Sequence, residues 1–265
     1  MSNTNVPGGT YTPASQLKKP AQTAPAVNPT HWAEEHAKLI VSVAVGAIVV
    51  ALGFIGWQYL GKRQERTAQD AYYAVAQKYE KAREEFERAK FNEFAPADQK
   101  TPGAKAATGD LQKDYGTIVT DLESVARDHA GTAAGAQAAI LASNTYIEYK
   151  QPEKAIEISR MTADKLSDSH TLKQLTNMML GNALAAKGDC QEAVTVWQKI
   201  IDNSKATFLH CDASLRAGLC FELLGKNDQA LEMYRKASAS ESGAASTARG
   251  LMRALEVKSK TPAKG

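Results

Sequence analysis

The sequence predicts an all-α protein in which a single transmembrane helix precedes a solenoid of helical repeats. Three observations carry this expectation. Positions 39–60 form an uncharged run of 22 residues. From Leu111 to Val257, apolar residues recur at helical spacing and nothing alternates as in a strand. Within that region a helix–turn–helix unit recurs at intervals of 38 and 37 residues, which is typical of stacked repeats.

The first 30 residues predict a disordered tail. They are rich in Pro, Thr, Ala and Gln and hold almost no large apolar side chains. Such a segment cannot bury enough apolar surface to offset the conformational entropy lost on folding. We also expect a short disordered C-terminus over residues 259–265.

Residues 31–61 predict a membrane anchor whose span covers about residues 39–60. At 1.5 Å per residue, 22 helical residues extend roughly 33 Å, enough to cross a hydrocarbon core of about 30 Å. Trp32 on one side and Trp57 and Tyr59 on the other suit the two membrane–water interfaces. A buried core helix seldom stays uncharged for this long, and the apolar region of a cleaved signal peptide is far shorter.

The charges beside the span leave its orientation open. Lys38 precedes the span together with Glu34 and Glu35, whereas the following flank is basic. The cations of that flank are Lys62, Arg63 and Arg66. Taken alone, the positive-inside rule places the C-terminal domain in the cytoplasm.

Residues 62–92 predict an amphipathic stalk helix, and residues 93–112 predict a loop. Apolar residues at steps of three and four form one stripe on the helix: Tyr72, Val75, Tyr79, Ala82, Phe86 and Ala89. The stripe suits a coiled-coil dimer, but two and a half heptads are short for one, so packing against the domain's own first helices is favoured. The loop contains two prolines and two glycines.

Residues 113–258 predict the repeat domain. A pattern of a helix end, a polar turn and a helix start occurs in three segments: 145–159, 183–197 and 220–234. Their marker alanines are Ala155, Ala193 and Ala230. In the second and third units a glycine stands twelve residues before the alanine and an aromatic residue four after it: Gly181 with Trp197, and Gly218 with Tyr234. The first unit has Ser143 and Ser159 at these two slots.

Small residues at such slots let two antiparallel helices approach closely, while the aromatic side chain fills the space between neighbouring units. This spacing resembles the tetratricopeptide repeat, slightly lengthened. An unrelated helical bundle remains the alternative.

Stacked repeats of this kind have a concave face lined by the first helix of each unit, where we expect partner binding. The candidate contact residues are Asn144, Met178, Asn182, Asp212 and Leu215. Ordinary helix surface is the alternative for each. A clamp for peptide carboxylates is not expected, because no lysine or arginine stands beside the asparagines at matching slots.

The composition excludes several other classes of protein. A net charge of +3, from 32 basic and 29 acidic residues without a polybasic stripe, argues against nucleic-acid binding. We find no CxxC, no ligand-spaced histidines, no nucleophile with a base and no phosphate loop, so we expect no metal, no cofactor and no enzyme activity. Cys190 and Cys220 should approach each other on antiparallel helices, either as a disulfide or as two buried thiols.

Three segments carry a further resemblance: Gly56–Tyr59 (GWQY), Ala71–Ala74 (AYYA) and Gly131–Glu157. With the single anchor and the repeats, they resemble the YfgM-like family, the ancillary subunits of the SecYEG translocon. The resemblance implies an inner-membrane protein with a cytoplasmic N-terminus and a periplasmic repeat domain, since large domains translocate despite flanking charge. Its partners would be the translocon and a membrane-anchored periplasmic chaperone or its clients. The alternative is a cell-envelope scaffold that self-assembles into homo-oligomers.

Overall fold

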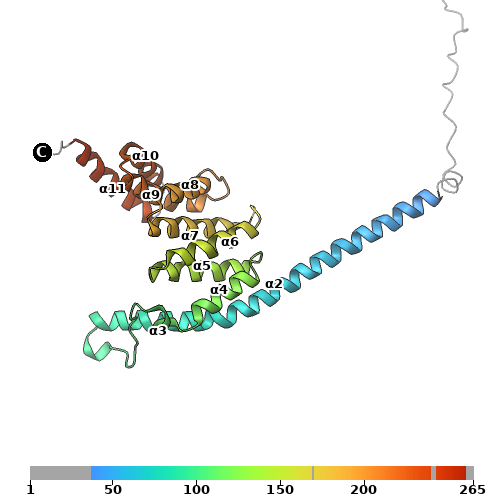
Figure 1. Cartoon of the computed structure of the whole chain (residues 1–265), viewed down its shortest axis with the longest axis horizontal. Coiled ribbons are helices and arrows are strands. Elements are labelled where there is room, and N and C mark those ends of the chain that lie inside the picture. The colour runs from blue at the N-terminus through green and yellow to red at the C-terminus, as the bar shows by residue number, and fades with distance from the viewer. Residues whose placement is uncertain (1–36, 169, 240–242, 261–265) are drawn as a thin grey trace, which may run out of the picture. The chain divides into compact units, whose positions relative to one another are not determined.

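The structure is a computed structural model of the 265-residue chain, and it describes residues 37–168, 170–239 and 243–260. The tail predicted over residues 1–30 lies outside the described residues. Every regular element in the described ranges is a helix, which confirms the all-α expectation (Figure 1). The chain divides into two units, Met1–Trp57 and Gln58–Gly265.

The described part of the first unit is the apolar beginning of helix α2 (Ala37–Phe94). By length and composition, α2 is long and apolar enough to cross a membrane. Its most apolar window of 18 residues has a mean hydropathy of 2.0, and none of that window is buried. This exposure argues against the buried core helix that a long apolar run also suggests.

The second unit contains the remainder of α2 and the helices that follow it. They are the 3₁₀ turn η1 (Ala97–Gln99) and the α-helices α3 (Leu111–Tyr115), α4 (Ile118–Asp128), α5 (Ala133–Glu148), α6 (Pro152–Lys165), α7 (Thr171–Lys187), α8 (Cys190–Ile201), α9 (Thr207–Leu223), α10 (Asn227–Ser238) and α11 (Gly243–Lys260). The last helix therefore extends two residues into the segment 259–265 that the sequence predicts to be disordered.

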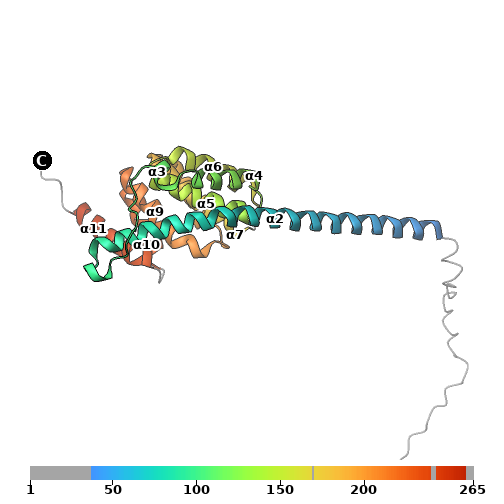
Figure 2. The ribbon, with the colours of Figure 1, turned by 90° about the horizontal axis from the view of Figure 1, so that it is seen from below.

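Helices α5 to α10 pack as three consecutive antiparallel pairs, and α11 packs against α10 (Figures 1 and 2). Local signals fix the ends of these helices. The Thr132 hydroxyl accepts the N–H of Gly135 at 3.0 Å and so caps α5. Pro152 occupies the first turn of α6, and Gly188 ends α7 with a φ of 98°, a backbone conformation that glycine adopts without strain.

Within the second unit, α2 packs as the first helix of the array. Val75, Tyr79 and Phe86 are buried in one apolar cluster with Tyr115 of α3. The Tyr79 ring stacks on the Tyr115 ring with centroids 5.4 Å apart. The Tyr79 hydroxyl also lies 3.1 Å from Thr145 Oγ1 of α5. The apolar stripe thus contacts this chain's own helices, as the sequence favoured over a coiled coil.

The segment 93–112, expected as a loop, contains the last residues of α2, the η1 turn and the start of α3. Asn92 fixes its beginning, because its side-chain amide donates to the Thr101 carbonyl at 2.8 Å and its Oδ1 accepts the Thr101 N–H at 2.9 Å. Residues 95–110, called the insertion below, therefore fold back along the end of α2 before the array continues.

Candidate partner-binding surface

The glycine and aromatic residues picked out by spacing meet inside each repeat. A β-carbon added to Gly218 of α9 would lie 2.6 Å from Tyr234 Cδ1 of α10, closer than carbon atoms pack. Gly181 of α7 has the same relation to Trp197 of α8. The aromatic side chain therefore rests on the first helix of its own unit, where only glycine leaves room. The marker alanines Ala155, Ala193 and Ala230 are fully buried.

The first repeat solves the same packing problem with two serines. Ser143 of α5 and Ser159 of α6 are both fully buried, and their hydroxyl oxygens lie 2.8 Å apart. One small polar pair thus takes the place of a glycine and a large ring. The hydrogen bond satisfies two hydroxyls that burial would otherwise penalise.

The solvent-exposed side of α5, α7 and α9 is called the first-helix face below. Asn144 and Asp212 are exposed on it, and Asn182 and Leu215 are half-buried. Met178 is not available there: it is 4% exposed and packs in the apolar cluster that contains Trp197 and Tyr234. The expectation that Met178 contacts a partner is therefore wrong, because its side chain fills the core between repeats.

The first-helix face exposes several apolar side chains on α9, which the candidate residues chosen from the sequence did not include. Leu219 occupies the slot of Asn182, 37 residues on, and is 40% exposed. Leu223, one turn further along α9, is 81% exposed, and Phe208 at the start of the helix is 54% exposed. The same spacing that aligned Asn144 with Asn182 points to Leu219, so the signal was present in the sequence.

Acidic groups at the ends of this face are already paired. Glu148 of α5 accepts a hydrogen bond from Arg83 of α2 at 3.0 Å. Glu222 of α9 accepts the Tyr234 hydroxyl at 3.0 Å, and burial together with this bond raises the pKa of Tyr234. Beside these paired groups, the exposed side of α9 combines Asp212 with the apolar side chains of Phe208, Leu219 and Leu223.

Cys190 of α8 and Cys220 of α9 form a disulfide across two neighbouring repeats, with their Cα atoms 5.2 Å apart. Both residues are buried. Cys211, also buried, is not part of this bond and lies with its Sγ 3.2 Å from the Ala237 carbonyl oxygen. The bond fixes α9 to the repeat before it and so holds the apolar end of the first-helix face in place.

A buried carboxylate attaches the insertion to the array. Asp114 accepts hydrogen bonds from the Thr108 N–H at 2.9 Å, the Gly109 N–H at 3.0 Å and the Tyr149 hydroxyl at 2.8 Å. Burial by itself would raise the pKa of this carboxyl, but the hydrogen bonds, with Thr108 first among them, outweigh burial and hold the pKa below its usual value. The charged form of Asp114 is the one that this arrangement stabilises.

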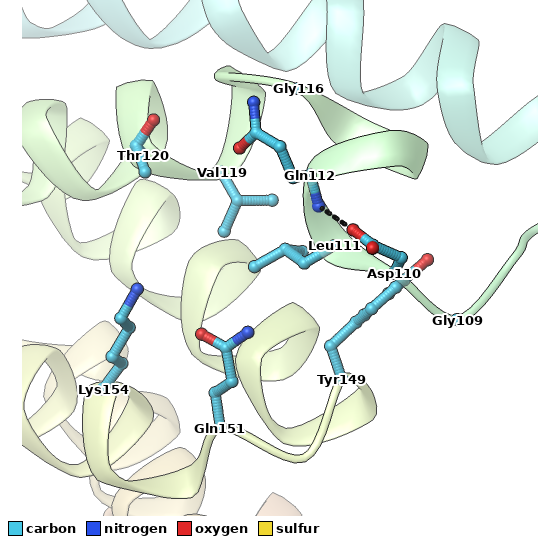
Figure 3. A pocket seen from close by; sticks show the side chains of 10 residues that line it. All are labelled: Gly109, Asp110, Leu111, Gln112, Gly116, Val119, Thr120, Tyr149, Gln151 and Lys154. Carbon is cyan, nitrogen blue, oxygen red and sulfur yellow. Dashed lines mark hydrogen bonds between the residues drawn. The ribbon is translucent and has the colours of Figure 1, made fainter.

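This attachment creates a hollow of about 460 Å³ beside the insertion. Figure 3 shows Tyr149, Gln151 and Lys154 on one side of it, facing Leu111, Gln112 and Val119 of α3 and α4. Asp110 at its edge is engaged in capping α3, since its Oδ1 accepts the N–H groups of Gln112 and Lys113. Lys154 also lies over the Tyr146 ring, 5.1 Å from its centroid. The lining of the hollow therefore combines apolar side chains with the amide groups of Gln112 and Gln151.

Comparison with known proteins agrees with the predicted repeat architecture. The tetratricopeptide repeat-like domain family matches residues 30–260. Among solved structures, one titled "Crystal structure of MamA" is similar at 20% sequence identity, with a TM-score of 0.42, covering 58% of this chain and 91% of that one. A likeness that distant carries no functional argument. No curated protein matches the sequence.

Proposed function

Because the chain belongs to the tetratricopeptide repeat-like domain family, we propose that it is a membrane-anchored, non-enzymatic interaction protein. In this proposal it is an ancillary subunit of the Sec translocon that links the translocon to a periplasmic chaperone or its clients. Its anchor is the apolar beginning of α2, and its binding surface is the first-helix face.

The exposed leucines of α9 carry the binding part of the proposal. Leu219 and Leu223 are one turn apart on the same side of one helix, and together with Phe208 they expose apolar surface along its length. The surfaces of soluble proteins seldom expose large contiguous apolar patches, and such patches usually mark sites of protein–protein contact. An amphipathic segment of a partner, laid along α9, would cover them.

The disulfide supports a periplasmic location for the repeat domain. Disulfides persist in oxidising compartments and are rare in the cytosol. The bond between Cys190 and Cys220 therefore favours the orientation that the basic flank opposes. The length of the second unit agrees with this choice, because domains of this size translocate largely regardless of flanking charge.

The link to the translocon rests on the resemblance to the YfgM-like family. Its three motif segments lie at the end of the apolar run, on α2 and over α5 and α6. They are helix-packing patterns of small and aromatic residues, so they support membership of a group of anchored repeat proteins.

Site-specific photo-crosslinking in the native membrane tests this proposal. A photo-reactive phenylalanine placed at Leu219 or Leu223 should cross-link to translocon subunits or to a membrane-anchored chaperone. The same residue at Thr195, exposed on α8 away from the first-helix face, serves as the control and should not. The proposal fails if the three positions give the same products.

A self-assembling envelope scaffold is the second candidate, and the end of α2 favours it. Phe91 is 57% exposed and Phe94 is 88% exposed, so this end presents two aromatic rings to solvent. In that case photo-crosslinking from Phe94 should give dimers of the chain itself, with no translocon product from Leu223.

Protease protection in intact spheroplasts tests the orientation separately. A periplasmic domain is digested while a cytoplasmic marker protein survives. If the domain is degraded only after lysis, it is cytoplasmic. The translocon proposal is then wrong, and a cytoplasmic, membrane-tethered scaffold replaces it.

A further inference from the structure

Three cations follow the apolar run directly and are called the basic collar below: Lys62, Arg63 and Arg66. All three are exposed on α2. Within the described part of the chain, none of them has a carboxylate oxygen within 4.0 Å. The same holds for Lys78 and Lys81 further along α2, whereas Arg83, Arg88 and Lys90 are paired with glutamates. The collar therefore has no ion-pair partner among the residues that the structure describes.

Glu65 is the one acidic residue between positions 61 and 69, and its carboxylate is engaged with another helix. Its carboxylate oxygens accept the N–H of Ala133 at 3.2 Å and the N–H of Ala134 at 3.3 Å. These N–H groups belong to the first turn of α5, where a helix has no internal acceptors and carries partial positive charge. The first turn of α5 thus compensates Glu65, and the collar does not.

The position of the collar along the helix matches the depth of lipid headgroups. At 1.5 Å per residue, Lys62, Arg63 and Arg66 lie roughly 3, 4.5 and 9 Å beyond Leu60, the last residue of the apolar run. The polar layer on each side of a bilayer is about 5–7 Å thick, and long basic side chains bend toward it from either side. All three charges therefore reach the level of the phosphates.

We propose that the basic collar is a binding site for anionic phospholipid headgroups. Because the Glu65 carboxylate is engaged with the first turn of α5, it leaves the collar free to contact lipid phosphates. This site operates in either orientation of the protein and does not depend on the translocon proposal.

Spin-label EPR on the full chain in lipid bilayers tests the site. The probes are spin-labelled phosphatidylglycerol and spin-labelled phosphatidylcholine in phosphatidylcholine bilayers, and the measured quantity is the ratio of their association constants with the protein. We expect a preference of about threefold to fivefold for phosphatidylglycerol at low salt, which falls toward one in 0.5 M salt because exposed charges are screened.

The variant Lys62→Gln/Arg63→Gln/Arg66→Gln should reduce the ratio to one. The matched control, Lys78→Gln/Lys81→Gln/Lys100→Gln, removes three exposed cations elsewhere in the second unit and should keep the wild-type ratio. Arg63→Gln is a single substitution that should leave the contact between Glu65 and α5 intact, because Arg63 lies about 200° around the helix from Glu65. It should lower the ratio to a value between those of the wild type and the triple variant.

Glu65→Gln tests whether the Glu65 carboxylate is bound to the first turn of α5 or instead neutralises the cations of the collar. If Glu65 is engaged with α5, its replacement leaves the ratio within about 1.5-fold of wild type. A wild-type ratio of one, a preference that survives in the triple variant, or a large rise in the Glu65→Gln variant would each overturn the proposal.

Discussion

Gly181 of α7 lies directly against the indole ring of Trp197 of α8. A β-carbon at position 181 would stand 2.8 Å from Trp197 Cδ1 and closer still to Nε1. Trp197 is 1% exposed, so its ring is enclosed by the core and is not free to move into solvent. The two helices of the second repeat therefore approach to a distance that only glycine permits.

Gly181→Ala should lower the free energy of unfolding by about 1–3 kcal/mol, because the added methyl group forces the indole or the helices apart. The effect opposes intrinsic preference, since alanine in a helix interior is favoured over glycine by about 1 kcal/mol. Thermal melting of the full chain in detergent, followed by circular dichroism, measures the change.

Gly250→Ala on α11 is the matched control, because nothing lies within 4 Å of a β-carbon there. Its melting temperature should equal or slightly exceed that of the wild type. Equal melting of the two variants would contradict the close contact between Gly181 and Trp197.

Ser143→Ala and Ser159→Ala should each cost about 1 kcal/mol of stability, since each leaves one buried hydroxyl without its main partner. The double variant removes both hydroxyls, so its loss should be smaller than the sum of the single losses by at least about 0.5 kcal/mol. A double-mutant cycle in urea measures this coupling. Strictly additive losses would show that the two serines do not act as a pair.

The repeat register was predictable because its contacts are local and recur. A small residue and a ring sixteen residues apart face each other whenever a first helix, a turn and a second helix have the same lengths, so spacing alone identified Gly181 with Trp197 and Gly218 with Tyr234. Spacing does not tell how deeply a slot is buried. Met178 shows this, because its slot faces the core between repeats.

The contacts of the insertion and of the first half of α2 could not be predicted in the same way. Tyr149 donates to Asp114 over a separation of 35 residues, and Glu65 caps α5 over 68 residues. Neither pair belongs to the repeat, so no internal periodicity indicates it. For the same reason, the sequence only weakly distinguished packing of the α2 stripe within the chain from a coiled-coil dimer. Tertiary packing decides which surface the stripe contacts.

Asp114→Asn should destabilise the chain by about 1–3 kcal/mol at pH 7, because an amide nitrogen replaces an oxygen that accepts hydrogen bonds from Thr108, Gly109 and Tyr149. The pKa of Asp114 is depressed in the folded chain. Its contribution to stability is therefore complete above the unfolded pKa of about 3.9 and is lost as the pH falls through the lower folded value.

The difference in stability between Asp114→Asn and wild type should accordingly persist from pH 7 to about pH 5 and shrink in more acidic solution. Cleavage by trypsin at Lys100 and Lys105 reports the local effect, and it should be faster in the variant at pH 7. Asp98→Asn, an exposed position in the same insertion, is the control. A difference that grows on acidification would contradict the role of the carboxylate.

Removing the disulfide with Cys190→Ser/Cys220→Ser should lower the free energy of unfolding by about 3–4 kcal/mol, because the bond closes a loop across 30 residues and restricts the unfolded chain. Thermal melting with and without a thiol reductant measures this in the full chain. The wild type should melt lower when reduced, whereas the double variant should not respond. Alkylation in denaturant followed by mass spectrometry supplies the control: the oxidised wild type takes up one alkyl group, at Cys211, and the reduced chain takes up three. Three groups without reductant, in chain isolated from its native membrane, would show that Cys190 and Cys220 remain thiols there and would remove the support that the bond gives to a periplasmic domain.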